Sequence, residues 1–115
     1  AGSYRAAFNL ARLYEHLGDT AQYEALLQTS IELNPRFPEG HFYLAKLLLD
    51  RNRDLERAAA LALRGLQFGG ASPMAPLGHY VLADIYNRQG RHADAAREVA
   101  RGRRLERKVD RSLNR

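Results

Sequence analysis

The sequence contains no cysteine, no tryptophan and a single methionine. Without cysteine there is no disulfide framework, no thiol nucleophile and no thiolate ligand for a metal ion. A chain without disulfides suits the cytoplasm and the periplasm equally. Localisation therefore stays open between the two compartments, with the cytoplasm slightly favoured.

Long apolar runs are also missing, because no stretch approaches the roughly 18 uninterrupted apolar residues of a membrane-spanning helix. The sequence therefore predicts no membrane span. The first residues, Ala1-Gly2-Ser3, have no basic segment followed by an apolar one, so we expect no signal peptide. We interpret residues 1–3 as an expression scar on a fragment of a larger protein.

The net charge of +5 arises entirely in the last part of the chain. Residues 97–115 contain eight basic and three acidic side chains, whereas residues 1–96 contain ten of each. Such a balanced body disfavours a nucleic-acid-binding domain and predicts a basic tail at about residues 105–115. Four cations recur at spacings of three and four residues and so share one helix face: Arg101, Arg104, Lys108 and Arg111.

Two interpretations of this basic tail stay open. Its cations could contact nucleic-acid phosphates or an anionic surface. Alternatively, Leu105 and Val109 cover the end of the domain, and the charges only solvate a capping helix. We favour the cap, because the aromatic residues on which single-strand binders stack bases are missing from this segment.

A pattern of a large apolar residue, a small residue and a second large apolar residue occurs three times, at offsets of 34 and 38 residues. Each copy precedes a turn and then a second amphipathic run, in which small residues recur where two helices must approach closely. The sequence therefore predicts three pairs of helices. The copies are Leu10-Ala11 with Tyr14, Leu44-Ala45 with Leu48, and Leu82-Ala83 with Tyr86; the small residues are Ser30, Gly65 and Gly102.

Asp19 and Asp54 are candidate N-caps, and Pro38 suits a first helical position. No strand is expected, because an alternation of apolar and polar residues is absent. We predict helices at about residues 4–17, 20–33, 38–51, 55–68, 74–89 and 92–110. The predicted core is Leu10, Ala11, Tyr14, Leu27, Ile31, Leu44, Ala45, Leu48, Ala62, Leu66, Leu82, Ala83 and Tyr86.

The order of residues in the first pair is Leu-Ala, Tyr, Gly, two small residues and the closing Pro35, and it resembles the tetratricopeptide repeat (TPR) pattern of 34 residues. The second pair departs from this pattern, with Asn52 in place of the turn glycine and Gly69-Gly70 where proline is expected. The resemblance implies an all-α fold, a right-handed superhelical stack of three helix-turn-helix repeats in one domain with an extended basic C-terminal capping helix. The expected repeats span about residues 4–37, 38–73 and 74–107.

In the TPR family, the first helices of successive repeats line a concave groove that meets the ligand. The resemblance therefore implies a groove with Phe8, Phe42 and Tyr80 as an aromatic row, and Arg12 and Lys46 beside it as carboxylate partners. A competing interpretation is that the aromatics fill the gap between adjacent first helices. The groove set is Arg5, Phe8, Asn9, Arg12, Glu15, Phe42, Tyr43, Lys46, Leu49, Tyr80, Asp84, Asn87 and Arg88, with His16, Glu39, Leu77 and Val81 as further candidates.

The function implied is a protein–protein interaction module that binds a peptide or protein partner and is not an enzyme. No cofactor or metal is expected, because the four histidines lack a ligand spacing and the serines lie in no nucleophile-elbow motif. Two alternatives stay open: an accessory domain of an enzyme in the same native chain, and contact with nucleic acid or an anionic surface through the basic tail. Exposed end faces of a three-repeat stack also leave a homodimer open.

Overall fold

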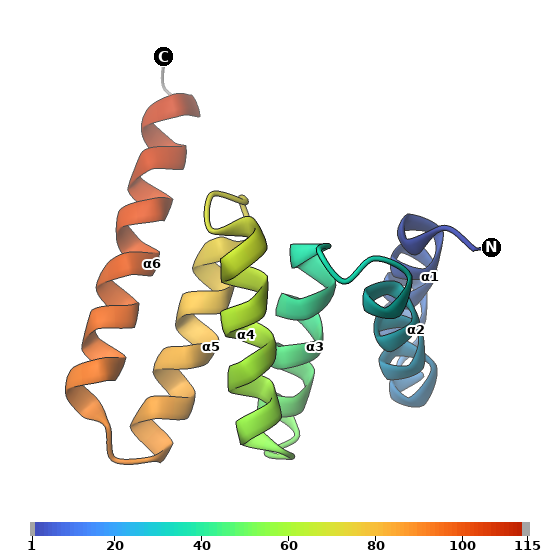
Figure 1. The fold of residues 1–115 in the computed structure, drawn as a ribbon, viewed down its shortest axis with the longest axis horizontal. Helices are drawn as coiled ribbons and strands as arrows, with labels where there is room; N and C mark the ends of the chain where they lie inside the picture. Colours follow the sequence, from blue (N-terminus) through green and yellow to red (C-terminus); the bar gives the residue numbers. More distant parts are fainter. Residues whose placement is uncertain (1, 114–115) are drawn as a thin grey trace.

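The computed structural model describes residues 2–113, and within this range every regular secondary-structure element is a helix, as predicted. Figure 1 shows the six helices in chain order. Ala1 of the interpreted expression scar and residues 114–115 of the predicted basic tail lie outside the described residues. The helices are α1 (Tyr4–Leu17), α2 (Thr20–Leu33), α3 (Pro38–Asp50), α4 (Leu55–Gly69), α5 (Ala75–Arg88) and α6 (His92–Leu113).

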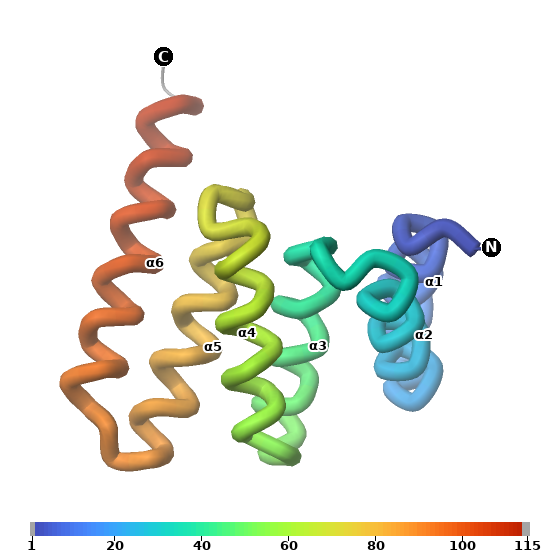
Figure 2. The backbone as a smooth tube through the Cα atoms, in the orientation of Figure 1, coloured from blue at the N-terminus to red at the C-terminus, as the bar shows by residue number. Residues whose placement is uncertain are grey.

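The helices form three antiparallel pairs that are stacked side by side. Contacts are most extensive within the pairs α1–α2, α3–α4 and α5–α6, and the stack continues through α2 on α3, α4 on α5, and α3 on α5. The tube in Figure 2 follows this path from the N-terminal pair to α6. In the described part of the chain, neither helix of the first pair makes extensive contact with α5 or α6, so the pairs form an open superhelical stack and not a closed bundle. The described chain measures 40 × 40 × 25 Å.

The helix ends follow the local chemistry of the sequence. Asp19 and Asp54 are N-caps, accepting hydrogen bonds from the backbone N–H groups of Gln22 at 3.1 Å and Arg57 at 3.4 Å. Gly18 terminates α1 with a φ of 77°, a left-handed conformation that favours glycine. Asn52 takes a φ of 49° after α3, so it supplies the conformation expected of the turn glycine that it replaces.

The core depends on small residues at the helix crossings. Phe42 is fully buried, and its ring occupies the space beside Gly65 of α4 and Gly78 of α5. A β-carbon on Gly65 would lie 2.5 Å from this ring, and one on Gly78 would lie 2.6 Å from it. In the third pair, a β-carbon on Gly102 of α6 would lie 2.6 Å from the ring of Tyr80. The glycines thus allow aromatic side chains of one helix to pack directly onto the backbone of another.

One predicted core residue is wrong. Leu10 is 43% exposed, and it lies on one stripe of α1 with Leu13 and Leu17, which are 53% and 68% exposed. Nothing within the described residues packs against the outer side of this first helix. A residue at this place in a stack of helix pairs is buried only where a preceding helix covers it.

The other end of the stack is polar. Helix α6 has 22 residues, against 14 in α5, and only Ala95, Glu98 and Gly102 of α6 are buried. Its exposed residues are mostly charged, and its C-terminal turns extend beyond α5 in Figure 1. Among residues 2–113, none of the helices combines the length and the apolar character needed to cross a membrane.

Candidate partner-binding site

Three depressions hollow the surface formed by the first helices of the pairs, α1, α3 and α5, which we call the concave face. They hold about 450 Å³ at the start of α1 and α3, about 310 Å³ between the ends of α1 and α3, and about 180 Å³ between α3 and α5. Lys46 and Asp50 form an ion pair at 2.8 Å and line both the second and the third depression. The second and third depressions are therefore adjoining parts of one surface.

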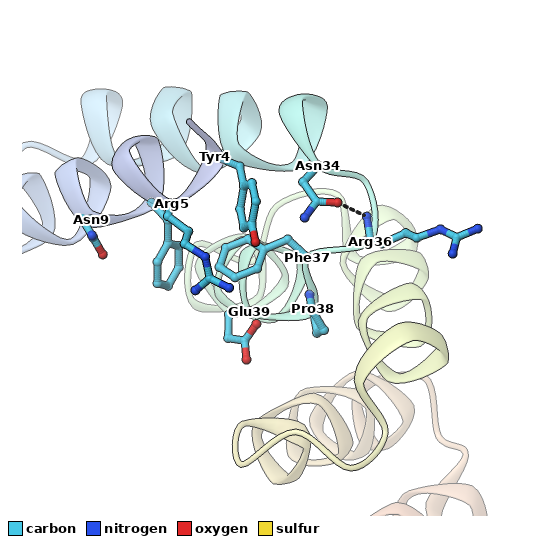
Figure 3. A pocket seen from close by; sticks show the side chains of 9 residues that line it. Tyr4, Arg5, Asn9, Asn34, Arg36, Phe37, Pro38 and Glu39 are labelled. Atoms are coloured by element: carbon cyan, nitrogen blue, oxygen red, sulfur yellow. Dashed lines mark hydrogen bonds between the residues drawn. The ribbon is translucent and has the colours of Figure 1, made fainter. Parts of the chain in front are cut away.

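A layer of aromatic rings from three segments of the chain runs from the second depression, which Tyr43 lines, to the floor of the first depression, which Tyr4, Phe8 and Phe37 line. The rings of Tyr4 and Phe37 lie 4.9 Å apart, Phe8 meets Phe37 edge to face at 5.0 Å, and Phe8 lies 5.5 Å from Tyr43. We call these four residues the ring layer. Figure 3 shows Tyr4 and Phe37 side by side at this depression. Edge-to-face and tilted packing suits the quadrupoles of the rings, so the layer stabilises the α1–α3 junction while part of it stays exposed.

Two arginines of α1 lie over this ring layer. The guanidinium of Arg5 lies 5.2 Å from the ring centre of Tyr4, and that of Arg12 lies 4.5 Å from the ring centre of Tyr43. Arg12 also forms an ion pair with Glu15 at 3.0 Å. Partial burial lowers the pKa of Arg12, but Tyr43 and Glu15 outweigh this effect and the pKa is raised. The layer therefore offers guanidinium groups above an apolar floor.

The rim of the first depression is polar. Asn34 accepts a hydrogen bond from the backbone N–H of Arg36 at 3.1 Å, and the Arg36 side chain points away from the rings (Figure 3). Glu39 accepts a hydrogen bond from the Ser72 hydroxyl at 3.0 Å, which ties this rim to the connection between α4 and α5. The lining residues are Tyr4, Arg5, Phe8, Asn9, Asn34, Arg36, Phe37, Pro38 and Glu39.

The second depression contains a buried tyrosine. Burial raises the pKa of Tyr23, and the neighbouring carboxylate of Glu15 adds to the effect. Arg51 donates to the hydroxyl of Thr20 at 2.7 Å and closes one side. A neutral phenol and an adjacent carboxylate give this depression a hydrogen-bonding character that the ring layer lacks.

The third depression has a different polarity. Asp84 forms an ion pair with Arg88 at 2.9 Å and, with Asp50, places two carboxylates at this end of the concave face. Leu77, Val81 and Tyr80 supply its apolar walls. The concave face is thus cationic and aromatic toward α1, and more acidic toward α5.

The predicted aromatic row is wrong, because the three equivalent aromatics do not share one environment. Phe42 is 0% exposed and belongs to the core, so it presents no surface to a ligand. Tyr80 packs onto Gly102 of α6 and donates a hydrogen bond to Glu106, which raises the pKa of Tyr80. Only Phe8 lies in the exposed ring layer. The aromatics of the second and third pairs instead fill spaces left by glycine in the neighbouring helices.

Three further members of the predicted groove set are engaged in other contacts. Leu49 is 5% exposed and belongs to the core, although it also lines the third depression. Asn87 pairs with the imidazole of His92 at 2.9 Å, at the turn between α5 and α6. Arg88 also donates to the side chain of Asn52 at 3.0 Å, at the turn after α3. Asn87 and Arg88 line none of the three depressions, because they bind neighbouring turns.

The remaining groove predictions do line the depressions: Arg5, Phe8 and Asn9 in the first, Glu15, Tyr43 and Lys46 in the second, and Tyr80 and Asp84 in the third. Arg12 lines none of the three depressions, but its guanidinium lies over the ring of Tyr43, which lines the second. Sequence reasoning missed Tyr4 and Phe37. Tyr4 precedes Phe8 by one helical turn and so lies on the same side of α1. Phe37 immediately precedes Pro38 at the start of α3. Both residues could have been found from these local positions, but a comparison of residues one repeat apart does not pick them out.

The buried histidines are packing residues. His41 lies 2.7 Å from the carbonyl of Pro35, and His79 lies 2.7 Å from Glu98, both through ring nitrogens. Among residues 2–113 no group of three or more histidine, aspartate and glutamate side chains could hold a metal ion.

Comparisons with known proteins agree with this architecture. Two family models, each described as a tetratricopeptide repeat, match residues 26–60 and 67–104. The crystal structure of MamA superimposes with a TM-score of 0.79 and 14% identity over 95% of this chain, which spans 61% of the MamA chain. The globular C-terminal domain of LpoP from P. aeruginosa superimposes with a TM-score of 0.73 and 25% identity, over 90% of this chain and 97% of that one. No curated protein sequence matches the chain significantly.

Proposed function

Because the chain belongs to the tetratricopeptide repeat family, whose repeats generally mediate protein–protein interaction and are typically non-catalytic, we propose that its concave face binds a peptide segment of a partner protein. The observation that carries this proposal is the ring layer with Arg5 and Arg12 above it. Tyr4, Phe8 and Tyr43 are only partly buried and Arg5 is exposed, whereas Phe37, at 8% exposure, joins the layer to the core. Tyr4, Arg5 and Phe8 line the first depression, which holds about 450 Å³. An exposed combination of aromatic rings and arginines is the composition enriched at protein-binding hot spots.

The chemistry of the face favours a segment with apolar and acidic side chains. The ring layer offers an apolar floor to a side chain of the ligand, and the guanidinium N–H groups of Arg5 and Arg12 are donors for carboxylates. The two arginines are seven residues apart on α1, which corresponds to about 10 Å along the helix axis. An extended peptide covers that distance in about three residues. Side chains on one face of an extended chain recur at every second residue, so the preferred ligand carries acidic residues two or four positions apart, at about 7 or about 14 Å, with an apolar residue on the same face.

A displayed library of random twelve-residue peptides tests this proposal, because it samples many ligands without assuming a particular partner. Peptides selected on the wild-type protein should be enriched in acidic and apolar residues. They should lose at least about tenfold in affinity for an Arg5→Ala/Arg12→Ala variant, which corresponds to about 1.4 kcal/mol.

The matched control is Arg91→Ala/Arg97→Ala. Arg91 also lies over a tyrosine, 4.2 Å from the ring centre of Tyr86, and both arginines pair with Asp94, but neither lines a depression of the concave face. This control should bind the selected peptides as the wild type does. If the Arg5→Ala/Arg12→Ala variant binds them equally well, or if no peptide is enriched, the concave face is not the binding site.

A further inference from the structure

The basic side of α6 borders a crevice that shares no lining residue with the three depressions of the concave face. It holds about 230 Å³ and lies between α6 and the turn that follows α4. We call it the α6 crevice. Its lining residues are Gly70, His79, Arg101, Arg104, Leu105 and Lys108.

The inner wall of the α6 crevice is fixed by a buried carboxylate. Glu98 is 6% exposed and accepts a hydrogen bond from Arg101 at 2.6 Å, while its second oxygen lies 2.7 Å from Nδ1 of His79. Glu98 therefore holds both side chains in place, and His79 links α5 to α6. Side chains that are already held lose little conformational freedom when a ligand binds.

The outer wall carries cations that have no such partner. Arg104 and Lys108 are exposed, and within residues 2–113 no carboxylate lies within ion-pair distance of either, whereas Arg97 and Arg101 of the same helix pair with Asp94 and Glu98. The positive charge of the α6 crevice is therefore not neutralised by the described chain. A ligand with negative charge gains from both cations without breaking an existing ion pair.

The spacing of these cations limits the ligand geometry. Arg104 and Lys108 are one helical turn apart, about 6 Å along the axis, and Arg111 continues the same side. Carboxylates on alternate residues of an extended chain recur at about 6.8 Å, and those four residues apart on a helix recur at about 6 Å. Leu105 lies between the cations and offers an apolar contact.

We propose that the α6 crevice is a second binding site, which takes an acidic segment of a partner polypeptide. Acidic side chains of the ligand pair with Arg104 and Lys108, and an apolar side chain covers Leu105. This site is independent of the concave face, so one molecule can hold two partner segments or two parts of one partner at once.

Two other anionic partners fit the crevice less well. No aromatic ring other than the imidazole of His79 lines it, so bases of a single-stranded nucleic acid find no stacking platform beyond this engaged side chain. A helix that lies in a membrane interface has a broad apolar face opposite its basic face. The exposed large apolar residues of α6 within the described range are only Val109 and Leu113, which are too few to form such a face.

Fluorescence anisotropy with a labelled twelve-residue peptide of alternating glutamate and alanine tests the site, with the glutamine–alanine peptide as the uncharged control. At low salt, about 50 mM, the wild type should bind the acidic peptide, and binding should weaken as ionic strength rises. An Arg104→Gln/Lys108→Gln variant should lose at least about tenfold in affinity. The absence of binding by the wild type would overturn the proposal.

The matched control removes the same charge from the same helix. Arg103 and Arg107 are also exposed, but each is rotated about 100° around α6 from the cation that follows it, and neither lines the crevice. Arg103→Gln/Arg107→Gln should change the affinity by less than about threefold. Equal losses in the two variants would mean that only net charge matters, and the site would be wrong. Circular dichroism on both variants checks that they are folded.

Further arms separate the sources of binding. The same measurement is made with a twelve-nucleotide single strand and with phosphatidylserine vesicles. If either binds the protein more tightly than the acidic peptide does, the ligand is a nucleic acid or a lipid surface, and the proposal is wrong. The Arg5→Ala/Arg12→Ala variant should bind the acidic peptide as the wild type does. If this variant alone loses binding, the peptide occupies the concave face, so the crevice proposal fails while the proposed function survives.

Discussion

The ring of Phe42 fills the space that a side chain on Gly65 would need, since a β-carbon there would lie 2.5 Å from it. This contact joins α3 to α4 and explains why an aromatic residue at a groove position of the repeat is absent from the groove. The neighbouring ring, Tyr80, repeats the arrangement with Gly102. Two of the three repeats therefore place the equivalent aromatic against a glycine.

Replacing Gly65 by alanine should destabilise the protein, although alanine is the better helix former by about 1 kcal/mol. The new methyl group overpacks against a fully buried ring, which costs about 1–3 kcal/mol and outweighs the helix propensity. We expect a net loss of about 1 kcal/mol in the free energy of unfolding, measured by urea denaturation. A second change, Phe42→Leu, should cost less in the Gly65→Ala background than in the wild type. A Gly65→Ala variant more stable than the wild type would contradict the contact.

Phe8 and Phe42 should respond differently to truncation. Phe42→Ala leaves a cavity in the core and should cost about 3–5 kcal/mol in the free energy of unfolding. Phe8→Ala removes a half-buried ring, so the cost should be clearly smaller, about 1–2 kcal/mol. Paired thermal and urea denaturation of the two variants measures the difference. Similar costs would show that Phe8 belongs to the core, and the ring layer would no longer be a candidate binding surface.

The two aspartate caps offer a matched comparison of backbone strain. Asp19 and Asp54 both accept a backbone hydrogen bond, but φ is −87° at Asp19 and 50° at Asp54. Asp19→Ala should cost about 1 kcal/mol for the lost cap. Asp54→Ala should cost about 1 kcal/mol more, because alanine also disfavours the left-handed conformation. Urea denaturation of both variants, with Asp54→Asn as the conservative control, gives the comparison. Equal costs at the two positions would remove the left-handed conformation as a source of strain.

His41 should make the protein less stable in mild acid. Burial lowers the pKa of His41; the hydrogen bond to the Pro35 carbonyl opposes this effect, and the charge of Arg64 adds to it. The bond to Pro35 engages Nε2, and Nδ1 is buried with no partner among the described residues, so the neutral ring is the form that fits. The unfolded chain therefore binds a proton near the ordinary pKa of about 6.5, whereas the folded chain binds it only at lower pH.

The stabilising contribution of neutral His41 is thus complete above about pH 6.5 and declines as the pH falls from there toward the lowered pKa of the folded state. Urea denaturation at a series of pH values between about 7.5 and 5 should show this decline in the wild type. A His41→Gln variant should show a smaller decline over the same range. A His41→Gln variant with an unchanged dependence would mean that other groups cause it.

The helix pairs could be predicted from the sequence because their signals are local. The N-caps Asp19 and Asp54, the proline at the start of α3 and the spacing of Leu44 and Leu48 depend on neighbours within a few residues. All six helices were predicted with ends that differ from the structure by no more than three residues.

The environment of each groove residue was harder to predict, because it depends on what lies across the helix interface. Phe8, Phe42 and Tyr80 occupy one register, yet Phe42 is fully buried, whereas Phe8 and Tyr80 are partly buried and line different depressions. Gly65 and Gly102 could have indicated how Phe42 and Tyr80 pack, because each of these rings lies against one of the glycines within its helix pair. The contact between the rings of Tyr4 and Phe37 depends on the path of the α2–α3 connection. Residue spacing along the chain does not encode this path, so the contact was not predicted.

The contrast between the leucine stripe on α1 and the charged surface of α6 gives the stack a direction of growth. A helix pair fused ahead of Tyr4 could bury Leu10, Leu13 and Leu17 against its own apolar side chains. A pair fused behind Leu113 would have to desolvate the arginines of α6 before it could dock. A helix pair with an apolar outer face should therefore stack onto the α1 end of the domain and not onto its α6 end.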